Sequence, residues 1–128
     1  MIVSSEIARG LDVYELMVNP LISANELAAA KTVKVPYWNT QDQQKFVWPQ
    51  TFVLAQAYLD QLERSKGLTP DRIKSARATL TSAEKAADRN RRAPLTQLAT
   101  QLTSAAGSSS DAAKVRMLAA TVNSLAGQ

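Results

Sequence analysis

A dense group of aromatic and amide side chains is the part of this sequence best suited to contact a ligand. Six of the seven aromatic residues fall between positions 37 and 58. Flat aromatic rings stack on the CH faces of sugars, and amides supply paired hydrogen-bond donors and acceptors. The pattern predicts a carbohydrate-binding surface formed by Tyr37, Trp38, Asn39, Gln41, Gln44 and Trp48. The alternative interpretation is that Trp38, Phe46 and Trp48 fill the end of the hydrophobic core, because Trp is usually largely buried.

Carboxylates are the main candidates for acid–base catalysis, because the chain contains no His and no Cys. This composition excludes a Ser-His-Asp triad, a thiolate nucleophile and a zinc site with His or Cys ligands. If the protein is a hydrolase, Glu26 and Asp42 lie near the aromatic residues and would form the catalytic pair, with or without a divalent metal. Acids one turn apart on a helix, such as Asp60 and Glu63, share one charged face and do not flank a cleft. We therefore expect no catalytic residues, no metal site and no cofactor.

Charge is distributed unevenly along the chain. The net charge is −1 over residues 1–50 and +5 over residues 51–128. Within the basic half, Asp60 and Arg64 have the i,i+4 spacing of an ion pair on one helix face. A cluster of arginines predicts an anion-binding face at Arg89, Arg91 and Arg92. The alternative is an ordinary solvated helix face, and nucleic acid is not an expected partner because no aromatic residues are interleaved with these cations.

The first 17 residues have the alternating, β-branched character of a β-hairpin. Two short segments, 2–6 and 11–16, are rich in β-branched or alternating residues and flank a turn in which Gly10 can adopt a positive φ. A pair of strands is marginal in water by itself, and its edges carry unpaired N–H and C=O groups. We therefore expect this hairpin to pair with a second copy of the chain, to pack on the rest of the molecule, or to fray.

From residue 18 onward, apolar residues recur at helical spacing. The pattern predicts helices over about 23–34, 51–65, 70–88, 94–106 and 111–126, with a further short helix over about 40–47. Short loops favour antiparallel packing of successive helices. The expected fold class is mainly α: an up-and-down bundle of four to five helices with a short N-terminal β-hairpin. The hairpin unit is residues 1–17 and the bundle domain is residues 18–128.

Several residues are of types that begin or end helices. Ser23 and Glu26 have the spacing of a capping box. Gly67 is placed to be the left-handed residue that follows a helix, and Pro94 is placed in the first turn of the next-to-last helix. Residues 90–93 are then expected to form a connector. Alanine supplies 21 of the 128 residues, which allows close helix packing but leaves few large side chains for the core.

Parts of the sequence resemble a known family. Residues 2–16, which contain the run RGLDVYEL, resemble the closing strands of the last blade in secreted bacterial β-propellers of the LVIVD-repeat type. Residues 21–26 and 39–49 resemble the segment that follows the propeller in those proteins. The helices around 57–62 and 83–86 are similar to C-terminal helical modules of the FIMAH kind. The resemblance implies that the chain is a fragment of a larger extracellular protein, secreted or periplasmic.

Together these patterns predict a non-catalytic helical binding module, with a small histidine-free hydrolase as the alternative. The expected partners are a glycan or an acidic ligand, and a second copy of the chain through the N-terminal hairpin. No apolar run approaches the ~20 residues that a membrane span needs. We therefore expect no membrane span.

Overall fold

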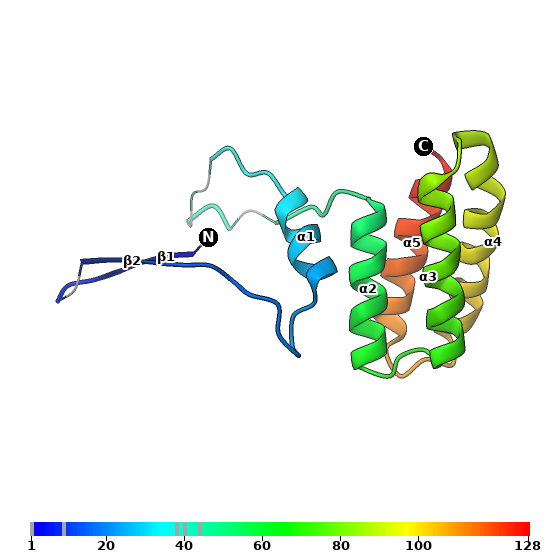
Figure 1. Ribbon diagram of the computed structural model, residues 1–128, viewed down its shortest axis with the longest axis horizontal. Coiled ribbons are helices and arrows are strands. Elements are labelled where there is room, and N and C mark those ends of the chain that lie inside the picture. Colours follow the sequence, from blue (N-terminus) through cyan, green and yellow to red (C-terminus); the bar gives the residue numbers. More distant parts are fainter. Residues whose placement is uncertain (1, 9, 38, 40, 44) are drawn as a thin grey trace.

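A computed structural model of the chain describes residues 2–8, 10–37, 39, 41–43 and 45–128. The described part is mainly helical, as predicted, with an antiparallel two-stranded hairpin ahead of five helices (Figure 1). The elements are β1 (Ile2–Glu6), β2 (Gly10–Tyr14), α1 (Ala24–Thr32), α2 (Phe52–Arg64), α3 (Pro70–Lys85), α4 (Asp88–Ala106) and α5 (Ala112–Ala126).

Helices α2 to α5 form a bundle in which each helix packs on the next and α5 closes the ring by packing on α2. The apolar stripes expected from the sequence face inward, and Leu59, Leu80, Leu95 and Leu118 are fully buried at the centre. Many of the remaining core residues are alanines, which lets the helices approach closely. Helix α1 packs on α2 alone, on the side away from the other helices (Figure 1).

Three helices begin with side-chain caps. The capping box of α1 is confirmed: the Glu26 amide donates to Ser23 Oγ at 3.1 Å, and the Ser23 amide donates to Glu26 Oε2 at 2.7 Å. Thr51 caps α2 and Asp111 caps α5 by accepting a bond from the backbone amide three residues further on. These bonds satisfy amides that have no partner within their own helix.

The end of α2 differs from the prediction at Gly67. Lys66, not Gly67, adopts the left-handed backbone, with φ of 54°. The Gly67 amide donates to the Leu62 carbonyl at 2.8 Å, which is the outer bond of a Schellman motif. Gly67 lacks room for a side chain, since a Cβ there would lie 2.7 Å from Leu62 Cδ2 and 3.0 Å from Asp111 Cβ. Packing, rather than φ, therefore explains this glycine.

The predicted connector at residues 90–93 is wrong, because these residues belong to α4. The helix begins at Asp88, whose acidic side chain favours a first turn, and the extended residues Ala86 and Ala87 form the connection instead. Pro94 consequently lies inside α4 rather than in its first turn. Its ring removes the amide that would otherwise bond to the carbonyl four residues earlier.

Two predictions before residue 50 are also wrong. The described residues of the expected helix over 40–47 form a turn and irregular chain, and none of them is helical. The spacing of Leu27, Ala30 and Val33 predicts these residues on the buried face of α1, but the buried position is Ala29 and Ala30 is exposed. Because α2 is the one helix that α1 contacts, only a narrow face of α1 is buried.

The predicted hairpin is present, and its strands pair in register from Ile2 opposite Tyr14 to Glu6 opposite Gly10. Gly10 has a φ of 90°, the positive value expected from the sequence. Directly opposite residues share a face, so Val3 and Val13 lie on one face, while Ile2 lies on the other. Among the described elements, β1 and β2 contact only each other, and the hairpin points away from the bundle (Figure 1).

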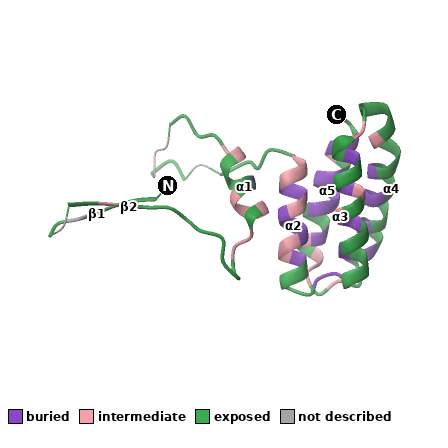
Figure 2. Cartoon of the chain, in the orientation of Figure 1, coloured by how far each residue is buried: buried purple, intermediate pink, exposed green. Residues whose placement is uncertain are grey.

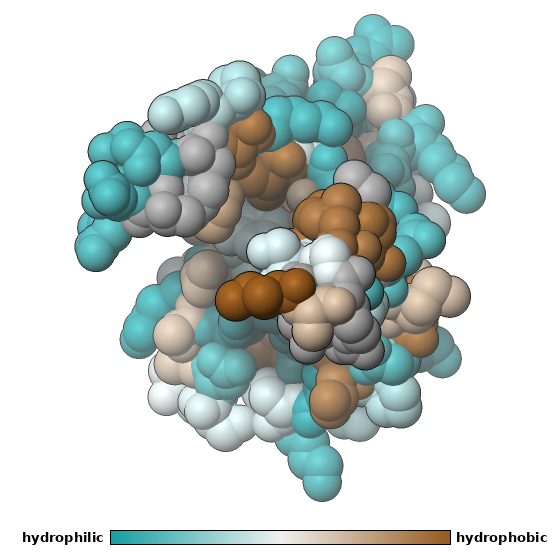
Figure 3. Space-filling view, turned by 90° about the vertical axis from the view of Figure 1, so that its left-hand side faces the viewer, coloured by the Kyte–Doolittle hydropathy of each residue, from teal (hydrophilic) through white to brown (hydrophobic). Residues whose placement is uncertain are grey.

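Burial separates the molecule into two parts. Figure 2 shows buried residues concentrated in α2 to α5, whereas the hairpin and the segment after α1 are exposed. Figure 3, which looks onto the hairpin side, shows apolar side chains on the surface beside polar ones. Of the large apolar residues that are exposed in the described part, all but Met117 lie at or before Trp48.

Candidate functional site

The Glu26 carboxylate connects α1 to α2. Arg64 donates to both carboxylate oxygens, at 2.7 Å to Oε1 and 3.1 Å to Oε2. The side-chain amide of Gln61 adds a bond to Oε1 at 2.9 Å. A two-pronged guanidinium contact of this kind fixes orientation as well as charge. The carboxylate is therefore held in one position at the start of α1.

Asp60 continues this polar network towards α3. One of its oxygens accepts bonds from Ser23 Oγ at 2.6 Å and Asn25 Nδ2 at 2.8 Å. Its other oxygen contacts Arg77 Nη2 at 2.6 Å, and the same nitrogen lies 2.7 Å from Glu63 Oε2. The network thus joins three helices, and it places the N-terminal end of α1 by polar contacts more than by apolar burial.

The catalytic interpretation of Glu26 and Asp42 gains no support from this geometry. Burial raises the pKa of Glu26, but hydrogen bonds from Arg64, the Ser23 amide and Gln61 outweigh it and lower the pKa to about 2. A carboxylate with so low a pKa is a poor proton donor and a weak base near neutral pH. Asp42 is exposed on a turn and does not line the pocket that Glu26 lines.

A pocket of about 210 Å³ lies over α2, between α1 and α5. Trp48, one of the predicted ligand-binding residues, forms part of its wall together with Glu26. The structure thus brings together Trp48, predicted to bind a carbohydrate, and Glu26, predicted to be catalytic in the alternative hydrolase hypothesis. The lining consists of Glu26, Ala29, Trp48, Leu54, Ala57, Tyr58, Gln61, Lys114 and Met117.

The polar groups of this pocket are set among aromatic rings. Lys114 Nζ lies 5.8 Å from the centre of the Tyr58 ring, within the range of a cation–π contact. Tyr58 is 7% exposed, and burial raises the pKa of its phenol, so the hydroxyl keeps its proton at neutral pH. Trp48 is 39% exposed. The pocket therefore offers one accessible ring, one ammonium group and one neutral hydroxyl.

Tyr37 and Phe46 lie apart from this pocket. Tyr37 is 71% exposed, and both residues line a separate hollow of about 410 Å³, to which Lys34 and Lys45 also contribute. The alternative that Phe46 and Trp48 fill the end of the core is wrong, because both are exposed and neither belongs to the core cluster. The predicted aromatic surface is therefore divided between two depressions.

The predicted amide residues have local roles where the structure describes them. Asn39 Oδ1 accepts a bond from the Gln41 amide at 3.0 Å, which stabilises the turn between them. Gln41 is exposed. Trp38 and Gln44 lie outside the described residues, as does any part they take in the predicted surface.

The predicted anion-binding arginines lie in the first two turns of α4. Arg89 and Arg92 are exposed, and Arg91 is half-buried and contacts Asp88 at 3.2 Å. Arg91 and Arg92 were expected on a connector, but all three arginines are helical. Arg89 and Arg92 are three positions apart and share one face of the helix, whereas Arg91, next to Arg92 in sequence, does not share that face.

The remaining residues of the Trp48 pocket that carry a polar group, Tyr58, Gln61 and Lys114, were not predicted from the sequence to be functional. Tyr58 borders the buried stripe of α2, which made it indistinguishable from an ordinary core residue. Gln61 and Lys114 are polar residues in helices that carry no other sign of a site, and they are separated by 53 positions along the chain. Only the packing of α5 against α2 brings Lys114 to Tyr58, and no local spacing encodes that contact.

No group of three or more acidic side chains in the described part of the chain could hold a metal ion. Among the helices that the structure describes, none is long and apolar enough to cross a membrane. No protein-family model matches the sequence, and comparisons with curated proteins and with solved structures found no similar protein.

Proposed function

We propose that this chain is a non-catalytic binding module whose ligand is a carbohydrate, bound at the pocket of Trp48, Tyr58 and Lys114. The observation that carries the proposal is the position of Trp48, an exposed indole at the rim of a concave site that also contains an ammonium group. Exposed Trp rings at such rims are suited to stacking on sugar faces.

The charge of the pocket favours an acidic sugar. The Glu26 carboxylate is already bonded to Arg64, so its charge is balanced. The Lys114 ammonium contacts the Tyr58 ring, and a carboxylate on a sugar would give it a stronger partner. A uronic acid residue stacked on Trp48 and paired with Lys114 would satisfy both features.

The exposed hairpin supports a second proposal, self-association through β1 and β2. Both faces of the hairpin carry exposed apolar residues, among them Ile2, Val3 and Val13. Two strands without neighbours also expose backbone donors and acceptors along both edges. Pairing with a second copy would satisfy the edges and cover the apolar side chains.

The resemblance of residues 2–16 to propeller strands supports an extracellular setting for the chain. In a propeller blade, such strands have neighbours on both edges and packing on both faces. The apolar residues on both faces of the observed hairpin fit that environment. We propose on this basis that the chain is part of a secreted or periplasmic protein of that kind.

The carbohydrate proposal is tested by isothermal titration with oligogalacturonate and, separately, with the neutral cello-oligosaccharide of the same length. We expect the acidic oligomer to bind more tightly than the neutral one. Trp48→Ala should weaken the binding of both oligomers at least tenfold, and Lys114→Met should weaken only that of the acidic one. Absence of binding to either oligomer would overturn the proposal.

Tyr14→Ala is the matched control, because Tyr14 is an exposed aromatic on the hairpin and does not line the pocket. It should leave both affinities unchanged. Equal losses for Tyr14→Ala and Trp48→Ala would show that binding does not depend on this pocket. Circular dichroism of each variant checks that the helices remain folded.

A further inference from the structure

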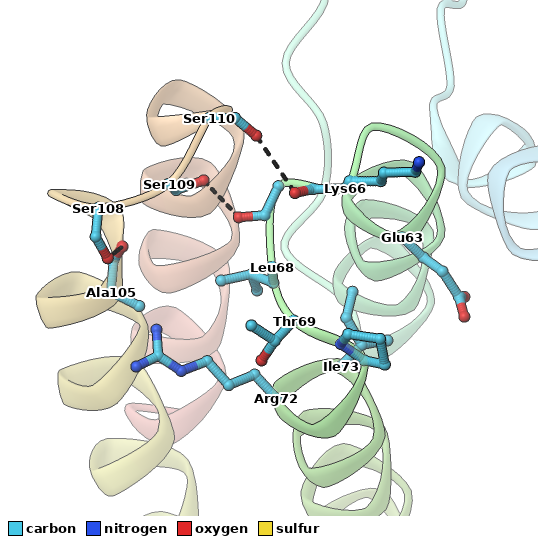
Figure 4. A pocket seen from close by; sticks show the side chains of 12 residues that line it. Glu63, Lys66, Leu68, Thr69, Arg72, Ile73, Ala105, Ser108, Ser109 and Ser110 are labelled. Carbon is cyan, nitrogen blue, oxygen red and sulfur yellow. Dashed lines mark hydrogen bonds between the residues drawn. The ribbon is translucent and has the colours of Figure 1, made fainter.

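A hollow of about 610 Å³ lies at one end of the bundle, away from Trp48. It is found where the α2–α3 loop meets the α4–α5 loop (Figure 4). A second hollow of about 390 Å³ between α3 and α4 shares Arg72 and Ala105 with it. Arg72 therefore stands between two adjoining depressions.

The walls of this cavity are held by bonds between the two loops. Ser109 Oγ donates to the Gly67 carbonyl at 2.6 Å, and Ser110 Oγ donates to the Lys66 carbonyl at 3.3 Å (Figure 4). The close contact between Gly67 and Asp111 fixes the same junction. A cavity with such walls is present before any ligand binds, which lowers the cost of ordering on binding.

Arg72 differs from the other arginines near the helix interfaces. Arg64 and Arg77 are bonded to carboxylates of neighbouring helices, and Arg91 contacts Asp88. Among the described residues, no carboxylate lies within ion-pair distance of Arg72. Figure 4 shows its side chain extending from α3 across the cavity towards Ala105 on α4 and Ser108 in the α4–α5 loop.

The rest of the wall adds a hydroxyl. Thr69 lines the cavity and its side chain makes no capping bond to α3. Lys66 also lines the cavity, but its ammonium group points away from Arg72 (Figure 4). The acid in the wall, Glu63, is bonded to Arg77 at 2.7 Å. The cavity wall therefore contains a guanidinium group without a carboxylate partner, and its one carboxylate is already paired.

We propose that this cavity binds a small oxyanion, the phosphate or carboxylate group of a small molecule, with Arg72 as its principal donor. A guanidinium group can donate two parallel bonds to such a group. The Thr69 hydroxyl lies on the same cavity wall and supplies a further donor. The site shares no lining residue with the Trp48 pocket, so it is independent of the proposed carbohydrate function.

The test is an NMR titration of the full ¹⁵N-labelled chain with sodium phosphate and, separately, sodium acetate, each compared with sodium chloride at equal ionic strength. We expect saturable amide shifts confined to residues 66–73 and 105–110. Tighter binding of phosphate would assign a phosphate ligand, and tighter binding of acetate a carboxylate ligand. Identical shifts with chloride would overturn the proposal.

Variants separate the site from general attraction by a basic surface. Arg72→Gln should weaken binding at least tenfold, and Arg72→Lys should give an intermediate affinity because it retains the charge without the two-pronged geometry. Arg116→Gln, on the exposed face of α5, is the matched control and should bind as the unaltered chain does. Equal affinity in Arg72→Gln and the unaltered chain would overturn the assignment.

Discussion

The two halves of this molecule treat apolar side chains in opposite ways. In residues 51–128 the large apolar residues are buried or partly buried between four helices, and Met117 is the exposed exception. Among the described residues between 2 and 48, most large apolar residues are exposed, and Ala29 is the one apolar residue that joins the core. The bundle is thus stabilised by its own contacts, whereas the N-terminal part presents a surface suited to contact something else.

Helix α1 is intermediate between the buried bundle and the exposed N-terminal part. It contributes Ala29 to the core, yet most of its specific contacts with α2 are charged or polar. Polar contacts of this exposure are worth less than apolar burial. We therefore expect local stability to be highest in the bundle, lower in α1 and lowest in the hairpin.

The largest effect is expected from removing a bundle leucine. Leu59 is fully buried, so Leu59→Ala removes apolar burial and leaves a cavity, which should reduce the free energy of unfolding by about 3 kcal/mol. Leu11→Ala makes the same chemical change on the exposed hairpin and should alter it by less than about 0.5 kcal/mol. Urea unfolding followed by circular dichroism measures both, and equal losses would refute the contrast.

A smaller loss is expected at the junction of the two loops. Gly67→Ala would force a Cβ against Leu62 and Asp111 and should cost about 2 kcal/mol. Gly107→Ala is the matched control, because no atom lies within 4 Å of the added Cβ and its backbone is helical. Its effect on the melting temperature should be close to zero. If both variants melt together, the close packing at Gly67 has no energetic weight.

The sequence predicted the bundle better than it predicted the contacts between its parts. Buried stripes recur every three to four residues within one helix, so positions such as Leu98 and Val122 could be read locally. The i,i+4 pairing of Asp60 with Arg64 could also be proposed locally. In the structure, however, Arg64 is bonded to Glu26 and Asp60 to Arg77.

The same limit explains the candidate site. Trp48 could be proposed from its residue type, but its neighbours Lys114 and Tyr58 come from helices that meet only through tertiary packing. The aromatic segment was also compatible with a position in the core, because its sequence does not show whether another element packs over it. Contacts between distant parts of the chain determine which residues line the pocket and whether the aromatic rings are buried. The spacing of residues within one element does not reveal those contacts.

The next prediction concerns α1. Glu26→Gln removes the charge that Arg64 contacts and should weaken α1 docking by about 1 kcal/mol. Amide hydrogen exchange in α1 should accelerate about fivefold, while exchange in α4 and α5 stays unchanged. Glu84→Gln, an exposed acid on α3, is the control and should change neither. Uniform acceleration across all helices would contradict a separate, weaker attachment of α1.

Acid should reproduce this change in the unaltered chain. The pKa of Glu26 is lowered from 4.5 to about 2 in the folded protein, so its stabilising contribution is complete above pH 4.5. It should be lost progressively as the pH falls from 4.5 to about 2, because over this range the proton binds Glu26 in the unfolded form more readily than in the folded form. Glu26→Gln should remove this part of the pH dependence of α1 exchange.

The smallest effect on stability is expected from the hairpin, although its effect on assembly should be large. Val3 and Val13 are opposite each other on one exposed face, so Val3→Lys with Val13→Lys places charge where a second copy would pack. Light scattering should show that the double variant is monomeric at concentrations at which the unaltered chain associates. The free energy of unfolding of the bundle should change by less than about 0.5 kcal/mol, because neither valine contacts a helix. Lys74→Gln, an exposed change on α3, should affect neither measurement. If the unaltered chain is monomeric throughout, the exposed hairpin does not drive self-association, and its apolar faces require a different partner.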